Sequence, residues 1–204
     1  MADRPPACRH ADAGELDKLR TMSATALLEA DKYGGQAVHW AAGSGHGATL
    51  AWLLSAEGGH HGDSEGINST SRSSKRRRPL HYAARNGHLD VVRYLCEEQR
   101  VDVDARDSQG VSPFQLAVWQ NHLDVARYLV EEHGVDVAQT NAFACGPQHW
   151  LGTAPRSCGD VLPMARWLQR RGVDMHAEQR QGHRPLHKAA WGGRLELCRW
   201  LRDE

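Results

Sequence analysis

Internal repetition constrains this chain more than any other feature of its sequence. One pattern occurs five times, as QAVHWAAGSGH, RPLHYAARNGHLDVVRYL, SPFQLAVWQNHLDVARYL, GPQHWLG and RPLHKAAWGGRLELCRWL. Its fourth position falls at His39, His81, Gln115, His149 and His187, so the steps are 42, 34, 34 and 38 residues. A unit of about 33 residues that recurs with insertions is typical of a solenoid, in which each unit buries its apolar face only against its neighbours.

The residues of the repeat fit a pair of antiparallel helices. A proline stands where the first helix would begin, because a first-turn residue needs no N–H there. The Ala83-Ala84 pair allows neighbouring helices to approach closely, and Gly87 ends the helix in a left-handed conformation, with Asn121 as the tolerated substitute one repeat later. Apolar residues at i, i+1 and i+4 mark the buried face of a second helix. These residues are Val91, Val92 and Leu95, and in the next repeat Val125, Ala126 and Leu129.

Together these elements resemble the ankyrin-repeat family, whose unit has a TPLHxAA start, a following GH, a second helix of the form VVxLL and a GADVNARDxxG hairpin. The nearest copies are RPLHYAARNGHLDVVRYL and residues 101–137, VDVDARDSQGVSPFQLAVWQNHLDVARYLVEEHGVDV. The resemblance covers nearly the whole chain. It implies an α-rich repeat solenoid of stacked antiparallel helix pairs joined by short hairpin fingers.

The resemblance also implies one array over residues 1–204. Its parts would be an N-terminal cap at 1–30, repeat 1 at 31–72 with a flexible insertion at 55–78, repeat 2 at 73–106, repeat 3 at 107–140, an irregular repeat 4 at 141–178 and a C-terminally short repeat 5 at 179–204. Repeat 4 inserts about five residues between its helices, near Pro155 and Pro163, so we expect it to be the least stable unit. No polar cap repeat follows Leu197 and Trp200, and we expect both to be uncovered.

Aromatic residues form two columns along the repeats. The column on the second helices is predicted to fill the core, and consists of Trp52, Tyr94, Tyr128, Trp167 and Trp200. The column on the first helices is Trp40, Tyr82, Leu116, Trp150 and Lys188. In ankyrin-like repeats this position faces a concave groove, where large rings would serve as binding hot spots; packing between repeats is an equal alternative.

The hairpin fingers supply a second candidate surface, because loop tips on a rigid scaffold often carry recognition. Gly34, Gly110 and Gly182 complete three of the turns, and we expect the fingers with Arg76 and Ala144 at this position to differ in backbone shape. The predicted partner-binding residues are Trp40, Tyr82, Arg85, Asn86, Trp119, Gln120, Trp150, Lys188 and Trp191 in the groove, and Tyr33, Gln109, Phe143 and Arg180 on the fingers.

Charge gives an alternative function. The 25 basic and 25 acidic side chains balance, so the chain lacks a general attraction to nucleic acid or anionic membranes. A local run of Lys75, Arg76, Arg77 and Arg78 follows Ser71, Ser73 and Ser74. It predicts either a nuclear regulatory protein that contacts nucleic acid or acidic partners, with an import signal that phosphorylation could neutralise, or simply a solvated charge run, which is the commoner case.

Motifs of catalysis, metal binding and secretion are not found. The sequence contains no GxSxG, HExxH or Gly-rich phosphate loop, and its five cysteines have no CxxC spacing. The repeated histidines are expected to bond the backbone and neighbouring fingers. No apolar run approaches the roughly 18–20 residues of a membrane span, and no apolar stretch follows Arg4. We therefore predict a non-enzymatic intracellular module, cytoplasmic or also nuclear, without cofactor or metal, that binds another protein and is itself a monomer.

Overall fold

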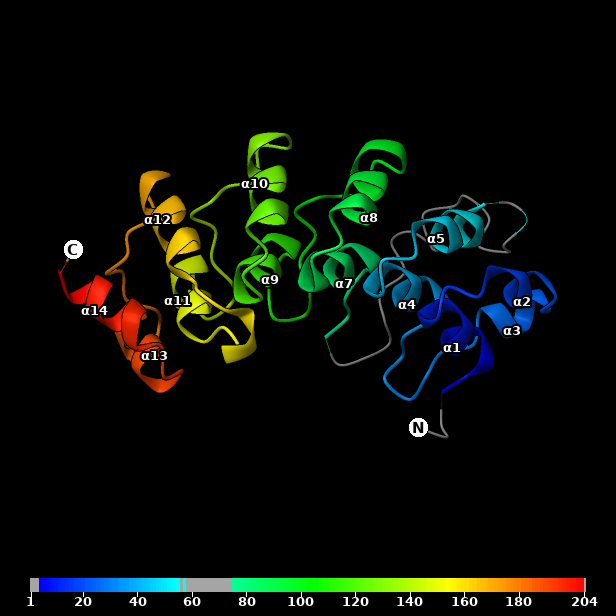
Figure 1. Cartoon of the computed structure of the whole chain (residues 1–204), viewed down its shortest axis with the longest axis horizontal. Helices are drawn as coiled ribbons and strands as arrows, with labels where there is room; N and C mark the ends of the chain where they lie inside the picture. The colour runs from blue at the N-terminus through cyan, green and yellow to red at the C-terminus, as the bar shows by residue number, and fades with distance from the viewer. Residues whose placement is uncertain (1–3, 56, 58–74, 204) are drawn as a thin grey trace. The chain divides into compact units, whose positions relative to one another are not determined.

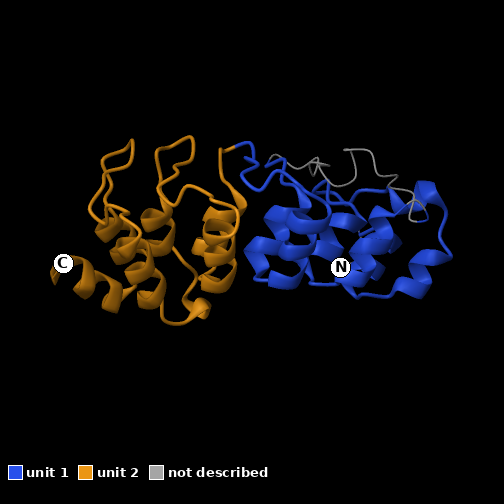
Figure 2. Cartoon of the chain, turned by 90° about the horizontal axis from the view of Figure 1, so that it is seen from above, with its two compact units in different colours: residues 1–108 blue, residues 109–204 orange. Residues whose placement is uncertain are grey.

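The computed structural model describes residues 4–55, 57 and 75–203, and in this part the chain is built from helices, turns and loops (Figure 1). It divides into two compact units, residues 1–108 and 109–204 (Figure 2). The predicted flexible insertion at 55–78 lies for the most part outside the described residues, as do Ser71, Ser73 and Ser74. None of the described helices is both long and apolar enough to cross a membrane.

In the first unit, helix pairs follow one another as the repeat pattern predicts. The elements are α1 (Pro6–Asp12), α2 (Leu16–Arg20), α3 (Ala24–Leu27), α4 (Ala37–Gly43), α5 (Gly47–Leu54), α7 (Pro79–Asn86), α8 (Leu89–Arg93) and the π-helical turn η2 (Tyr94–Glu98). The first helices of successive pairs, α1, α4 and α7, pack side by side. Close approach is possible because Ala41, Ala42, Ala83 and Ala84 at their contacts are fully buried and small.

The second unit repeats the same arrangement. Its elements are α9 (Pro113–Trp119), α10 (Leu123–Glu131), α11 (Pro147–Gly152), the 3-10 turn η3 (Arg156–Cys158), α12 (Leu162–Arg170), α13 (Pro185–Trp191) and α14 (Leu195–Asp203). Helices α9, α11 and α13 are neighbours, and each packs on its own second helix. The core between them contains Phe114, Leu116, Leu129, Leu151, Met164 and Leu168.

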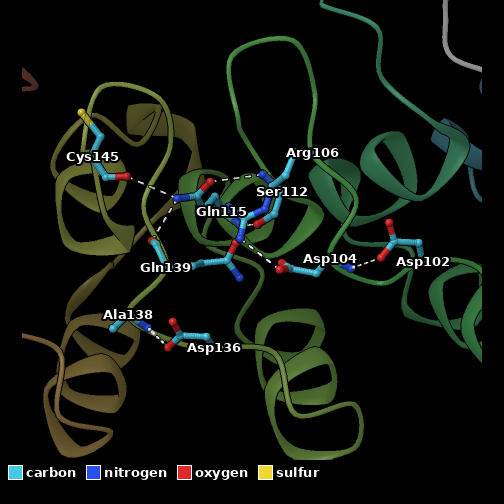
Figure 3. A network of polar contacts seen from close by, with 9 residues as sticks. All are labelled: Asp102, Asp104, Arg106, Ser112, Gln115, Asp136, Ala138, Gln139 and Cys145. Carbon is cyan, nitrogen blue, oxygen red and sulfur yellow. Dashed lines mark hydrogen bonds and ion pairs between the residues drawn. The ribbon is translucent and has the colours of Figure 1, made fainter.

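The repeated histidines cap the first helices. Nδ1 of His39 accepts the backbone N–H of Gln36 at 3.2 Å, and Nδ1 of His81 accepts that of Arg78 at 3.2 Å. Gln115 does the same with Oε1, at 3.1 Å from the Ser112 nitrogen, and its Nε2 donates to the Gln139 and Cys145 carbonyls at 3.1 and 3.3 Å (Figure 3). One side chain thus satisfies an N–H at the helix start and contacts the next finger, which is the kind of bonding predicted for the histidines at this position.

Adjacent fingers are also joined directly by backbone hydrogen bonds. The nitrogens of Ser108, Ala142 and Arg180 donate to the carbonyls of Lys75, Gln109 and Phe143 at 2.9, 3.1 and 3.2 Å. Each of these bonds joins one finger to the next within the same unit.

The expectation that two fingers differ in backbone shape is wrong. Arg76 and Ala144 have φ values of 49° and 57°, in the same left-handed region as Gly110 at 72°. In the finger of Ala144, Oδ1 of Asn141 accepts the N–H groups of Phe143 and Cys145 at 2.9 and 3.0 Å. Two such bonds outweigh the roughly 1–2 kcal/mol that a left-handed residue with a Cβ costs.

The column of aromatic residues on the second helices belongs to the packing, as predicted. Tyr128 and Trp167 are 5% and 4% exposed, and Trp52, Tyr94 and Trp200 are half-buried.

At the C-terminal end, the two side chains expected to be uncovered, Leu197 and Trp200, are buried and half-buried. Leu197 is 2% exposed because it faces the α12–α13 side of its own unit, whereas Trp191 and Leu195 are 80% and 60% exposed.

Candidate partner-binding groove

In the first unit, the predicted groove residues gather around one hollow of about 270 Å³. Trp40, Tyr82, Arg85 and Asn86 line it from α4 and α7, and the fingertip residue Tyr33 closes it from one side. Tyr33 is 67% exposed. The sequence therefore identified five side chains that the fold brings together.

Some of these side chains also contact other residues of the chain and so stabilise the fold. Nδ2 of Asn86 donates to the Gly43 carbonyl at 2.6 Å, and Tyr82 lies edge-on against the His39 ring at 5.6 Å. Burial, and secondarily the charge of Arg77, lowers the pKa of Arg85. These contacts preorganise the floor of the hollow, since a side chain already fixed loses little entropy when a partner binds.

A second hollow of about 410 Å³ adjoins the finger of residues 31–35 in the first unit. Some of its lining residues were not predicted from the sequence. The Arg4 guanidinium lies 3.6 Å above the Trp40 ring and pairs with Asp12 at 2.6 Å. Asp31 accepts the Trp40 indole N–H with Oδ2 at 3.0 Å. Asp31 could have been found, because it stands eight residues before the capping His39, as Asp107 does before Gln115.

The second unit has its own hollow of about 340 Å³, lined by residues of α11, α13 and the fingers. Four predicted residues line it, namely Gln109, Phe143, Trp150 and Lys188, together with Asn141, Cys145, His149, Thr153 and Gln181. Phe143 is 45% exposed at its mouth. Trp119 packs edge-on against Trp150 at 6.4 Å and donates its indole N–H to the Thr153 carbonyl at 3.1 Å.

The remaining predicted residues lie elsewhere in this unit. Oε1 of Gln120 accepts a hydrogen bond from the Cys158 thiol at 3.4 Å, so Gln120 contacts the insertion of repeat 4. Arg180 is exposed on its finger, and the Lys188 ammonium lies 5.5 Å from the centre of the exposed Trp191 ring. Gln120, Arg180 and Trp191 do not belong to the lining of the hollow.

The titratable groups of the hollow are affected mainly by burial. Burial lowers the pKa of His149, against the opposing effect of its backbone hydrogen bonds, and raises the pKa of the Cys145 thiol. Elsewhere burial raises the pKa of both Cys8 and Cys96 to about 12. Such thiols are poor nucleophiles. Within residues 4–55, 57 and 75–203, no three His, Cys, Asp or Glu side chains form a cluster suited to a metal ion.

The basic run is divided by the fold. Lys75 and Arg76 are exposed, but Arg77 is 7% exposed and pairs through Nε with Asp107 at 3.1 Å. Arg78 is half-buried and lies 3.5 Å from Asp102. Two of the four cations thus have carboxylate partners of their own.

Comparison with known proteins agrees with this geometry. A family model described as ankyrin repeats (3 copies) matches residues 38–141, and a search of curated proteins found no match. Ankyrin repeats are generally modules for protein–protein interaction. The stacked helix pairs, the capped first helices and this match together place the chain in the ankyrin-repeat family.

Proposed function

We propose that this chain is a non-catalytic binding module that holds a partner protein in the hollows of its two units and against its fingers. The observation that carries the proposal is the position of the exposed aromatic side chains. Tyr33 and Phe143 are 67% and 45% exposed, and each lies at a hollow whose floor contains a tryptophan. Large rings beside a preformed concave surface are typical of binding hot spots.

The chemistry of the hollows supports binding rather than catalysis. The histidine His149 is used to cap a helix, and the Cys145 thiol is held in its protonated form by burial. Indole, amide and carbonyl groups remain at the surface of the hollow, and these are the groups that fix the orientation of a bound peptide.

Cross-linking in cell extract, with and without nuclease, tests the proposal. We compare the wild-type chain with the double variant Tyr33→Ala/Phe143→Ala. The control is Leu28→Ala, which removes an apolar side chain that is 43% exposed and lines neither hollow. We expect a set of proteins that is still cross-linked to the wild type after nuclease treatment. The control variant should cross-link to the same proteins, and the double variant should not.

Two results would contradict the proposal. If every captured protein bound the double variant as well as the wild type, the hollows would not be the binding surface. If capture disappeared after nuclease treatment, the nucleic-acid function suggested by Lys75 and Arg76 would be favoured instead.

A further inference from the structure

The two tryptophans at the floors of the hollows have different hydrogen-bonding surroundings. Trp40 and Trp150 each follow the capping histidine of their repeat, and each stands nine residues after a polar finger residue, Asp31 or Asn141. In the first unit, Oδ1 of Asp31 accepts the N–H groups of Tyr33 and Gly35 at 2.8 and 2.9 Å. Its second oxygen, Oδ2, accepts the indole N–H of Trp40 at 3.0 Å. Every polar atom of this pair is satisfied inside the chain.

In the second unit the same position carries an amide. Oδ1 of Asn141 accepts the N–H groups of Phe143 and Cys145 at 2.9 and 3.0 Å, which repeats the pattern of Asp31. Because both partners are donors, only the oxygen of the amide can occupy this place, and the other atom is necessarily the NH₂ group. The first unit therefore has an acceptor, Asp31 Oδ2, where the second unit has a donor, Asn141 Nδ2.

The consequence is seen at Trp150. Its Nε1 atom is buried and has no hydrogen-bond partner among the residues that the structure describes. A buried donor left without an acceptor costs about 1–3 kcal/mol, so an acceptor supplied from outside would be bound with a corresponding gain. Trp150 and Asn141 line the same hollow, and a ligand seated there meets Nε1 once the side chains that cover this atom move aside.

The charge of the hollow selects the kind of acceptor. Among the described residues that line it, Lys188 is charged at neutral pH and none is a carboxylate, and burial lowers the pKa of His149, which favours its neutral form. The amide side chains of Gln109 and Gln181 stand at its edge. Two N–H donors and an ammonium group favour an anion, and two oxygens in one plane suit them better than a single carbonyl oxygen.

We propose that the hollow of the second unit binds the carboxylate of an Asp or Glu side chain of the partner protein. Its oxygens accept hydrogen bonds from Trp150 Nε1 and Asn141 Nδ2, and Lys188 balances the charge. The donors here are side chains, whereas the carboxylate at a chain end is commonly held by a series of backbone N–H groups. This inference rests on the proposed function and specifies the partner's chemistry in one of the two hollows.

The variant Asn141→Asp tests the proposal with minimal change to the fold. Asp31 shows that a carboxylate in this position makes the same two finger hydrogen bonds and satisfies the tryptophan internally. Because it gives the Trp150 indole an acceptor, the variant is expected to have an unfolding midpoint no lower than that of the wild type and to lose carboxylate binding. Lys188→Met removes the cation. Arg166→Ala removes an exposed cation of α12 that does not line the hollow and is not a predicted binding residue, and serves as the control for general charge attraction.

Random peptides with amidated C-termini are selected on the full-length wild-type chain, and the selected peptides are titrated into each variant. We expect the selected peptides to contain an Asp or Glu that binding requires. Binding should be at least about tenfold weaker to Asn141→Asp and to Lys188→Met, and unchanged to Arg166→Ala. The indole N–H resonance of Trp150 should shift with the acidic peptide and not with its Glu→Gln or Asp→Asn counterpart. A second arm uses peptides that lack acidic side chains and have a free C-terminal carboxylate.

Failure of this inference is distinct from failure of the proposed function. Suppose that the selected peptides bind the wild type and do not bind Tyr33→Ala/Phe143→Ala. If these peptides need no acidic side chain, or if they bind Asn141→Asp as well as the wild type, the inference is overturned and the binding function stands. Binding confined to free C-termini would overturn it in favour of a chain end. Selected peptides that bind the Tyr33→Ala/Phe143→Ala variant as well as the wild type would contradict both.

Discussion

A histidine in each of four repeats caps a helix by accepting a backbone N–H with its Nδ1 atom. In repeat 4, Nδ1 of His149 accepts the Gly146 N–H at 3.3 Å, so the ring proton is on Nε2, which lies 3.2 Å from the His183 carbonyl oxygen. A proton added to Nδ1 would face the Gly146 N–H and break the cap. Burial acts in the same direction and lowers the pKa of His149.

The first prediction concerns pH. Because the pKa of His149 in the folded chain lies below its ordinary value of 6.5, the unfolded chain takes up the proton first as the pH falls. The stability contributed by His149 is therefore fully present above 6.5 and is lost as the pH falls from there through the folded pKa. Urea unfolding at a series of pH values measures it. In His149→Gln, which copies the cap of Gln115, the free energy of unfolding should fall less steeply below that pH; equal slopes would refute the assignment.

The second prediction concerns two adjacent arginines. Arg77 pairs with Asp107 where their side chains are 9% and 0% exposed, whereas Arg78 pairs with an Asp102 side chain that is 61% exposed. Removing one partner of a buried pair costs about 3–5 kcal/mol, but an exposed pair contributes only about 0–1 kcal/mol. Arg77→Ala should lower the free energy of unfolding by several times as much as Arg78→Ala. Equal losses in denaturant titrations would show that burial does not distinguish them.

At the level of elements, the insertion of repeat 4 is held from two sides. Nδ2 of Asn121 donates to the carbonyls of Cys158 and Asp160, both at 2.9 Å. From the other side, Arg194 donates to the Gly159 carbonyl at 2.8 Å and to that of Ala154 at 2.9 Å. The expectation that repeat 4 is locally the least stable remains a prediction, and these contacts are what would limit its opening.

The third prediction uses Asn121, whose φ of 62° lies in the left-handed region. Asn121→Gly relieves the backbone strain at this position but removes both donated hydrogen bonds. Amide hydrogen exchange should therefore become faster at residues 156–160 and change little in α9, which Asn121 follows. Slower or unchanged exchange in the insertion would mean that the side chain does not hold it.

At the level of the whole molecule, helices in each unit pack mainly on the preceding and following repeat, as α4 does on α1 and α7, and α11 does on α9 and α13. In such an array stability is approximately a sum over units and their nearest-neighbour interfaces. A defect in one repeat is therefore expected to weaken its neighbours more than distant repeats.

The fourth prediction follows from this locality. Leu201→Ala empties a site in α14 that is 2% exposed, and Leu19→Ala empties one in α2 that is fully buried. Each should cost about 2–5 kcal/mol. Hydrogen exchange should become faster in α13 and α14 for Leu201→Ala, and in α1 and α2 for Leu19→Ala. If either variant accelerated exchange equally in all four helices, the chain would unfold as a single cooperative body instead.

What the sequence determined by itself are the features set by neighbours along the chain. Helix starts, the bonding of the repeated histidines to the backbone, the left-handed turn at Asn121 and the buried face of the second helices depend on residues a few positions apart. Each is also repeated, so the five copies confirm one another.

Only the tertiary structure decided which side chains of different repeats meet. The run from Lys75 to Arg78 looks uniform in the sequence, yet Arg77 is buried because Asp107 from the next repeat faces it. Likewise only the structure shows that the indole N–H of Trp40 has an acceptor in Asp31, whereas that of Trp150, which lines the same hollow as Asn141, has none among the described residues. Contacts between repeats depend on side-chain direction and spacing in three dimensions, which a one-dimensional period does not contain.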